Sequence, residues 1–198
     1  MKYVNQLDYP DLPYVTRTDM DEINREKGKT TTVASSGCGL CSAVMVADRL
    51  RPDRRFELAD ALQLSYDVKA NFEIGTDGER FFPAFAAKLE LRCESAKDPD
   101  ALRQCLKDGG AVIVLVSGSR DGYSGIFSNN EHWIAAVSEE PDGRILVLDS
   151  AFRADKYTTK ERREKVEVKD FGLCLCEIKT LEEESAPYEK PFYLFWRE

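Results

Sequence analysis

The chain has 198 residues, 42% of them hydrophobic and 32% charged, which is the composition of a soluble globular domain. Its net charge of −8 argues against nucleic acid or an anionic membrane as the main partner, because both bind basic surfaces. No segment approaches the roughly 18 apolar residues of a membrane-spanning helix, and the N-terminal stretch MKYVNQLDYP lacks the apolar core of a signal peptide. We therefore expect one cytoplasmic domain without a membrane span.

Residues 1–34 show no clear periodicity, and we expect them to form an ordered N-terminal arm. The segment DYPDLPY is broken by proline and should be extended, whereas EKGKTTT is typical of a loop. Apolar side chains along the arm could anchor it to the rest of the domain. They are Tyr3, Val4, Leu7, Tyr9, Leu12 and Tyr14.

Residues 35–110 are expected to form the helical part of the domain. Four helices are predicted, within residues 38–51, 54–67, 78–90 and 98–110. Asp53 could cap the second helix, and Thr76 or Asp77 the third, in which Pro83 must introduce a kink or mark the true start. The fourth helix has an aspartate cap, a proline near its first turn and glycine after its end.

Residues 111–198 change character and are expected to form the sheet part. The β-branched run AVIVLVSG predicts a buried strand, and HWIAAVSEE, PDG and RILVLDSA predict a strand–turn–strand unit. FGLCLCEIKT and PFYLFWRE are two further predicted strands. Helices followed by mostly antiparallel strands form an α+β pattern within a single domain, since the elements do not alternate as in βαβ folds.

The stretch SSGCGLCSAVM contains two of the six cysteines, at Cys38 and Cys41. A structural zinc site requires four ligands, and the chain has one histidine to assist, so we expect no metal. A thioredoxin-like redox pair requires a preceding strand, and none is predicted before Ser35. A nucleophilic cysteine fits better, because the N-terminus of a helix favours the reactive thiolate. Gly37 and Gly39 would leave room for a substrate backbone.

A cysteine nucleophile requires a base, and His132 is the only histidine in the chain. It begins a predicted strand, and Asp149 ends the strand that follows the PDG turn. If these two strands pair around the turn, Asp149 lies close enough to orient the imidazole. The structural alternatives stay open at this point, namely a core cysteine, a structural histidine and an aspartate that closes a strand.

The order Gln6, Cys38, His132, Asp149 resembles that of papain-like cysteine peptidases. The segments NQLDYPDLPY, TTTVASSGCGLCSAVMV, HWIAAV and GRILVLDSA are more closely similar to a bacterial branch related to double-glycine (bacteriocin) leader peptidases. That branch has a glutamine near an aromatic and proline-containing arm, GCGPTS-x-AM at the start of a helix, a histidine that begins a strand and an aspartate that ends the next. The resemblance spans residues 5–151.

The resemblance implies a papain-like fold, with a helical left lobe that carries Cys38 and an antiparallel right lobe that carries His132 and Asp149. Cys38 would be the nucleophile, His132 the base and acid, and Asp149 the orienting carboxylate. Gln6 would donate its side-chain amide to the oxyanion hole beside the Cys38 backbone N–H; the alternative for Gln6 is an ordinary surface amide. The implied reaction is cleavage of a peptide or amide bond in a peptide or protein substrate, without a cofactor.

Two rival functions use the same residues. One is an acyltransferase or amidase with the same triad, and the other is a papain-fold domain that binds peptides without catalysis. The chain departs from the family pattern at Leu40, where proline is usual, and at Cys41, where threonine is usual. A disulfide between Cys41 and Cys38 would silence the enzyme, which makes redox control an open alternative. The segment 153–169 is interpreted as an exposed connector or, alternatively, as a lid or substrate loop, and the mixed charges of 158–170 indicate a solvated loop or helix face.

Overall fold

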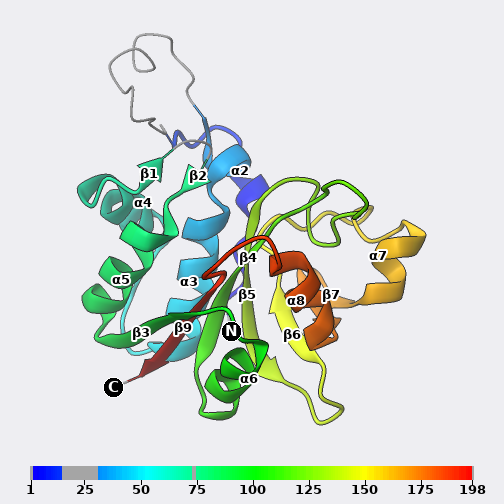
Figure 1. Cartoon of the computed structure of the whole chain (residues 1–198). Coiled ribbons are helices and arrows are strands. Elements are labelled where there is room, and N and C mark those ends of the chain that lie inside the picture. Colours follow the sequence, from blue (N-terminus) through cyan, green and yellow to red (C-terminus); the bar gives the residue numbers. More distant parts are fainter. Residues whose placement is uncertain (1, 15–30, 73–74, 198) are drawn as a thin grey trace.

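The computed structural model describes residues 2–14, 31–72 and 75–197. Over these residues the chain forms an α+β fold, as predicted, around one seven-stranded sheet (Figure 1). The strand order is β3-β9-β4-β5-β6-β8-β7, and neighbouring strands pair antiparallel. The strands of this sheet are β3 Leu91–Ala96, β4 Ala111–Val116, β5 His132–Glu139, β6 Ile145–Leu148, β7 Val166–Asp170, β8 Leu173–Cys176 and β9 Phe192–Arg197. A separate pair is formed by β1 Asn71–Phe72 and β2 Gly75–Thr76.

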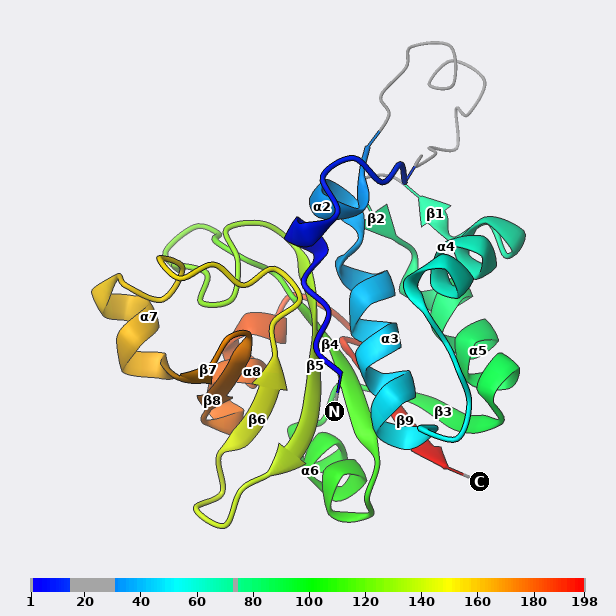
Figure 2. The ribbon, with the colours of Figure 1, turned by 180° about the vertical axis from the view of Figure 1, so that it is seen from behind.

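Helices cover both faces of the large sheet (Figures 1 and 2). The helical elements are η1 Gln6–Asp8, α2 Val33–Ser36, α3 Cys38–Leu50, α4 Leu58–Asp67, α5 Gly78–Leu89, α6 Pro99–Lys107, α7 Lys160–Lys165 and α8 Ile178–Ser185. Ala111 and Ile113 of β4 face the core formed with α3, α4 and α5, whereas Val112 and Val114 face the core formed with α6 and α8. Because both faces of β4 are buried, its sequence is a continuous apolar run.

The predicted helix that begins at Cys38 is confirmed as α3, and the one preceded by Asp98 is confirmed as α6. The predicted start of the second helix is wrong. Asp53 binds Arg51 instead of capping a helix. The helix α4 begins only after Glu57, which forms a capping box with Asp60 and so provides hydrogen-bond acceptors for free backbone N–H groups at the helix start.

The third predicted helix is confirmed as α5. Asp77 is its cap, because the side-chain oxygen accepts hydrogen bonds from the backbone N–H groups of Glu79 and Arg80. Pro83 lies inside the helix and so does not mark its start.

The sequence patterns miss β3 and α8, because both elements carry few apolar residues. The edge strand β3 pairs only with β9 and alternates poorly, with mainly polar side chains in LRCESA. The predicted strand FGLCLCEIKT ends at Cys176, and its last residues belong to α8, whose buried face includes Thr180 and Glu184. The mixed-charge run 158–170 is expected from its sequence to be a solvated loop or helix face. α7 within it has no buried side chain, as expected, but the run also contains β7, an edge strand that is exposed beyond Val166.

The described part of the N-terminal arm, residues 2–14, runs over β5 between α3 and β6 (Figure 2). Val4 and Tyr14 are buried, and the arm is joined to the residues before α2 by a bridge between Pro13 and Thr32. Most of the loop predicted for EKGKTTT lies outside the described residues.

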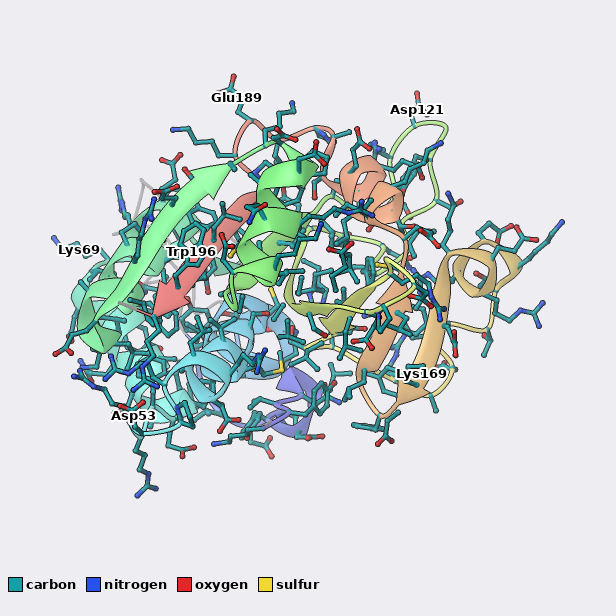
Figure 3. The ribbon with its side chains drawn as sticks, turned by 90° about the horizontal axis from the view of Figure 1, so that it is seen from below. Asp53, Lys69, Asp121, Lys169, Glu189 and Trp196 are labelled. Carbon is teal, nitrogen blue, oxygen red and sulfur yellow. The ribbon has the colours of Figure 1, made fainter. Side chains whose placement is uncertain are left out.

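The outer surface of the domain is charged. Seen from below, Asp53 beyond the C-terminal end of α3 and Lys169 on β7 lie at opposite sides of the molecule (Figure 3).

Among the helices of the described residues, none combines the length and apolar composition that crossing a bilayer demands.

Candidate active site

Cys38 is the first residue of α3 and is partly exposed, whereas Cys41, one turn later, is fully buried. Small residues make this helix start possible. A Cβ on Gly37 would lie 2.6 Å from the Val33 side chain, so the tight junction between α2 and α3 requires glycine. A Cβ on Gly39 would lie about 3 Å from the Thr76 and Trp133 side chains. Gly39 therefore lets β5 and the β1–β2 pair approach the start of α3.

His132 is the first residue of β5, and Asp149 immediately follows β6. The two strands pair antiparallel, with Ala135 opposite Leu148, which brings both residues to the same end of the hairpin. His132 Nε2 lies 2.9 Å from Asp149 Oδ1, and both side chains are buried. The expected contact between the histidine and the aspartate is therefore present.

The Asp149 carboxylate accepts four hydrogen bonds and is fully buried. His132 and the backbone N–H of Ala151 bind Oδ1, at 2.9 and 3.0 Å. Lys156 Nζ and the Tyr157 hydroxyl bind Oδ2, at 2.6 and 2.8 Å. Burial alone would raise the pKa of Asp149, but the Lys156 charge and the bond to His132 outweigh burial and hold that pKa below its usual range. The carboxylate is thus a fixed negative charge.

The Cys38 thiol and the His132 ring interact, and each shifts the pKa of the other. Burial would raise the pKa of Cys38, but the bond to His132, the imidazolium charge and backbone hydrogen bonds from Trp133 and Gly39 lower it below the ordinary value. Because Asp149 binds Nε2, the ring presents Nδ1 to the thiol. The site therefore favours a thiolate beside an imidazolium.

The other five cysteines have the opposite shift. Burial raises the pKa of each of them, to about 12 for three and further for the other two. The three are Cys93, Cys105 and Cys174, and the two are Cys41 and Cys176. All six are free thiols. Cys38 is thus the one cysteine whose surroundings favour its reactive form.

Burial would lower the pKa of His132, yet its bonds to Asp149 and Cys38 raise that pKa above the ordinary 6.5, against an opposing effect of the Lys156 charge. The imidazole therefore lies between the Cys38 thiolate and the Asp149 carboxylate, and the Lys156 ammonium lies on the other side of that carboxylate. A proton can be gained on this ring when the thiolate forms and can be released later to a leaving group.

Gln6 is buried in η1 beside the helix that leads to Cys38. Its side-chain Nε2 donates to the Ala34 carbonyl at 2.7 Å, and its backbone N–H donates to the Ser150 carbonyl at 2.7 Å. Gln6 Oε1 has no hydrogen-bond partner among the described residues. The arm thus links α2 to the residue that follows Asp149, and Gln6 is not the ordinary surface amide of the alternative interpretation.

Three residues at the site were not expected from the sequence. Lys156 and Tyr157 lie in the segment interpreted as an exposed connector, but both are buried against Asp149. Tyr3 donates its hydroxyl to the Asp149 carbonyl at 2.6 Å, and its ring packs so closely on Gly172 that a Cβ there would lie 2.0 Å from it. A lysine and a tyrosine seven and eight residues after an aspartate form no recognised motif, so the sequence offers no signal for them.

Within the described parts of the chain, no three His, Cys, Asp or Glu side chains cluster as metal ligands would. A surface pocket of about 360 Å³ lies beyond the C-terminal end of α3, the end opposite Cys38, between Lys2, Asp48 and Phe56. It is lined by charges of both signs, and we assign it no role in the site.

No protein-family model matches the chain, and no curated protein matches it. The geometry of Cys38, His132 and Asp149 therefore carries the functional proposal.

Proposed function

We propose that this chain is a cysteine hydrolase with a papain-like fold, which cleaves peptide or amide bonds through Cys38, His132 and Asp149. The observation that carries the proposal is the buried His132–Asp149 pair beside Cys38, a partly exposed residue at the start of α3 whose thiol has a lowered pKa. A nucleophile, a base and a group that orients the base are the parts that acyl transfer needs.

The first half of the reaction forms an acyl-enzyme. The Cys38 thiolate attacks the carbonyl carbon of the substrate, and the C=O electron pair moves onto the oxygen. When the tetrahedral intermediate collapses, the C–N bond breaks and the His132 imidazolium gives its proton to the departing amine. The products are a free amine and a thioester on Cys38, with His132 neutral.

The second half returns the enzyme to its starting state. Neutral His132 removes a proton from water, whose oxygen attacks the thioester carbon. The C–S bond then breaks, and a carboxylic acid leaves while the thiolate–imidazolium pair forms again. Asp149 keeps the imidazole oriented in both halves and does not itself change protonation, because its pKa lies below the usual range.

The oxyanion of each tetrahedral intermediate requires donors. We assign this role to the Cys38 backbone N–H, at the start of α3, and to the Gln6 amide. The Gln6 Nε2 carries two protons, and one of them is bound to the Ala34 carbonyl. We assign the second proton to the oxyanion.

The same residues would serve an acyltransferase or an amidase, because the acceptor and the leaving group do not alter the roles of the triad. A peptide-binding domain without catalysis has less support. Such a domain gains nothing from a thiol of lowered pKa or from four hydrogen bonds on the carboxylate behind the histidine.

Acyl-enzyme formation tests the proposal without knowledge of the natural substrate. An activated acyl donor, such as a peptidyl p-nitrophenyl ester, is mixed with the protein, and the acylated residue is located by mass spectrometry. We expect one acyl group, on Cys38, and none in Cys38→Ala. Cys41→Ser is the matched control and should still be acylated. Acylation that persists in Cys38→Ala, or that is absent from the native chain, contradicts the proposal.

A further inference from the structure

A lysine lies behind the aspartate of the site. Lys156 is buried, and its ammonium binds Asp149 Oδ2 at 2.6 Å and the Ala151 carbonyl at 3.1 Å. The other carboxylate oxygen binds His132 at 2.9 Å. One carboxylate is thus shared between an ammonium on one side and an imidazole on the other.

The surrounding chain fixes this lysine in place. The Lys156 carbonyl accepts a hydrogen bond from Arg162 Nη1, and the neighbouring Tyr157 binds the same carboxylate oxygen as the ammonium. The Tyr157 ring stacks on Phe152, with ring centroids 6.1 Å apart. A long, flexible side chain held at both its backbone and its ammonium group has lost the freedom that lysines usually keep at a surface.

We propose that Lys156 is a positioning residue, which acts through Asp149 to let the His132 ring exchange its proton. This inference rests on the proposed function. With the ammonium present, His132 can lose its proton and leave Asp149 still paired with a cation. Without the ammonium, the loss of that proton would leave an unpaired carboxylate in the core, which is costly. His132 would then hold its proton too tightly to act as a base on water.

The other groups around this pair are neutral or anionic. Cys38 faces His132 from α3, and Tyr3 of the N-terminal arm binds the backbone of Asp149. The Asp149 carboxylate also has Tyr157 and, from β8, Cys174 as neighbours. Burial raises the pKa of both of these groups. Among the largest influences on the pKa values of His132 and Asp149, Lys156 is the cation besides the imidazolium itself.

The chain has a single histidine, so one NMR titration reports the pKa of His132 directly. The titration uses ¹⁵N-histidine-labelled protein in a Cys38→Ala background, so that the thiol does not titrate with the ring. Lys156→Gln shortens the side chain by one atom and keeps a hydrogen-bond donor but removes the charge, and it should raise the pKa of His132 by about one to two units. Lys160→Gln is the matched control, because Lys160 in α7 is 76% exposed and pairs only with Glu164 at 3.9 Å. It should leave the pKa of His132 unchanged.

A change of less than about 0.3 unit in folded Lys156→Gln overturns the inference and leaves Lys156 a structural residue. If Lys156→Gln does not fold in buffer alone, the titration is repeated with Lys156→Gln, Lys156→Met and the chain with the native lysine in concentrated sucrose, which favours the folded state and leaves Asp149 in place. The pKa of His132 should again be higher in the chains without the ammonium, and an unchanged pKa overturns the inference in the same way.

The failure of this inference is distinguishable from the failure of the proposed function. The pKa of His132 is measured without substrate, so it reports the coupling to Lys156 even if Cys38 forms no acyl-enzyme. In the chain that retains Cys38, deacylation at neutral pH should be slower in Lys156→Gln than in the native chain, whereas acylation should persist. Equal deacylation rates together with normal acylation would contradict the inference and leave the hydrolase proposal intact.

Discussion

Replacing Asp149 by asparagine should destabilise the domain strongly. The carboxylate accepts hydrogen bonds from four donors, whereas an asparagine side chain has one acceptor oxygen and an NH₂ group that must face at least one of those donors. The substitution also leaves the Lys156 ammonium, whose side chain is 5% exposed, without its carboxylate. Nearly the same shape is kept, so the effect reports charge and hydrogen bonding more than packing.

The magnitude follows from the burial of the pair. Removal of one partner of a buried ion pair costs about 3–5 kcal/mol, because the other charge stays in the core uncompensated. Domains of this kind have a total stability of about 5–15 kcal/mol. For a chain of this length, each kcal/mol lowers the melting temperature by about 2–4 °C, which gives an expected fall of roughly 6–20 °C.

Urea unfolding at neutral pH measures this cost, with the slope of the transition checked for two-state behaviour. Asp155→Asn is the control, since Asp155 is 78% exposed in the same segment and pairs only with Arg153 at 3.5 Å. It should unfold at the native midpoint. A loss below about 1 kcal/mol in Asp149→Asn would refute the view that the Lys156–Asp149–His132 group is a tightly coupled buried unit.

Three further results are expected. Gly172→Ala should destabilise the domain by at least about 1–2 kcal/mol, because Gly172 has φ +77° and an added Cβ would lie 2.0 Å from the Tyr3 ring; native-like stability would contradict this. Gln6→Ala should lower turnover about a hundredfold or more with nearly unchanged KM and intact Cys38 alkylation, and an unchanged kcat would exclude the oxyanion role. Since the pKa of folded Asp149 lies below its ordinary 3.8, the stability it contributes is complete above that pH and lost as the pH falls below it. Acid unfolding of Asp149→Asn should therefore be less steep below pH 3.8 than that of the native chain.

Local sequence signals were sufficient where an element carries its own pattern. The aspartate caps before α5 and α6 and the apolar run of β4 are visible in the sequence, and so is the hairpin that brings His132 to Asp149. The start of α4 was misplaced, because Asp53 resembles a cap in the sequence but binds Arg51 in the structure. Local patterns of this kind do not show which of two acidic residues a helix will use.

The rest could not be predicted, because it depends on contacts between distant segments. The edge strand β3 forms only by pairing with β9, about a hundred residues later in the chain. In the sequence, nothing distinguishes Lys156 from the other charged residues of its segment. Its burial against Asp149 is visible only in the folded structure. Likewise, the hydrogen bond from Tyr3 to the Asp149 carbonyl joins positions that are 146 residues apart.

The central claim is that Cys38 is an activated nucleophile. The direct measurement is the rate of iodoacetamide alkylation of each cysteine as a function of pH, with the modified residues located by mass spectrometry. Because the pKa of Cys38 is lowered and the pKa of each other cysteine is raised, Cys38 should react first, already at about pH 6. Cys93 is the internal comparison, since it is the other partly exposed cysteine. If Cys93 reacts first, or if Cys38 reacts only above about pH 8.5 as an unperturbed thiol does, the account is contradicted.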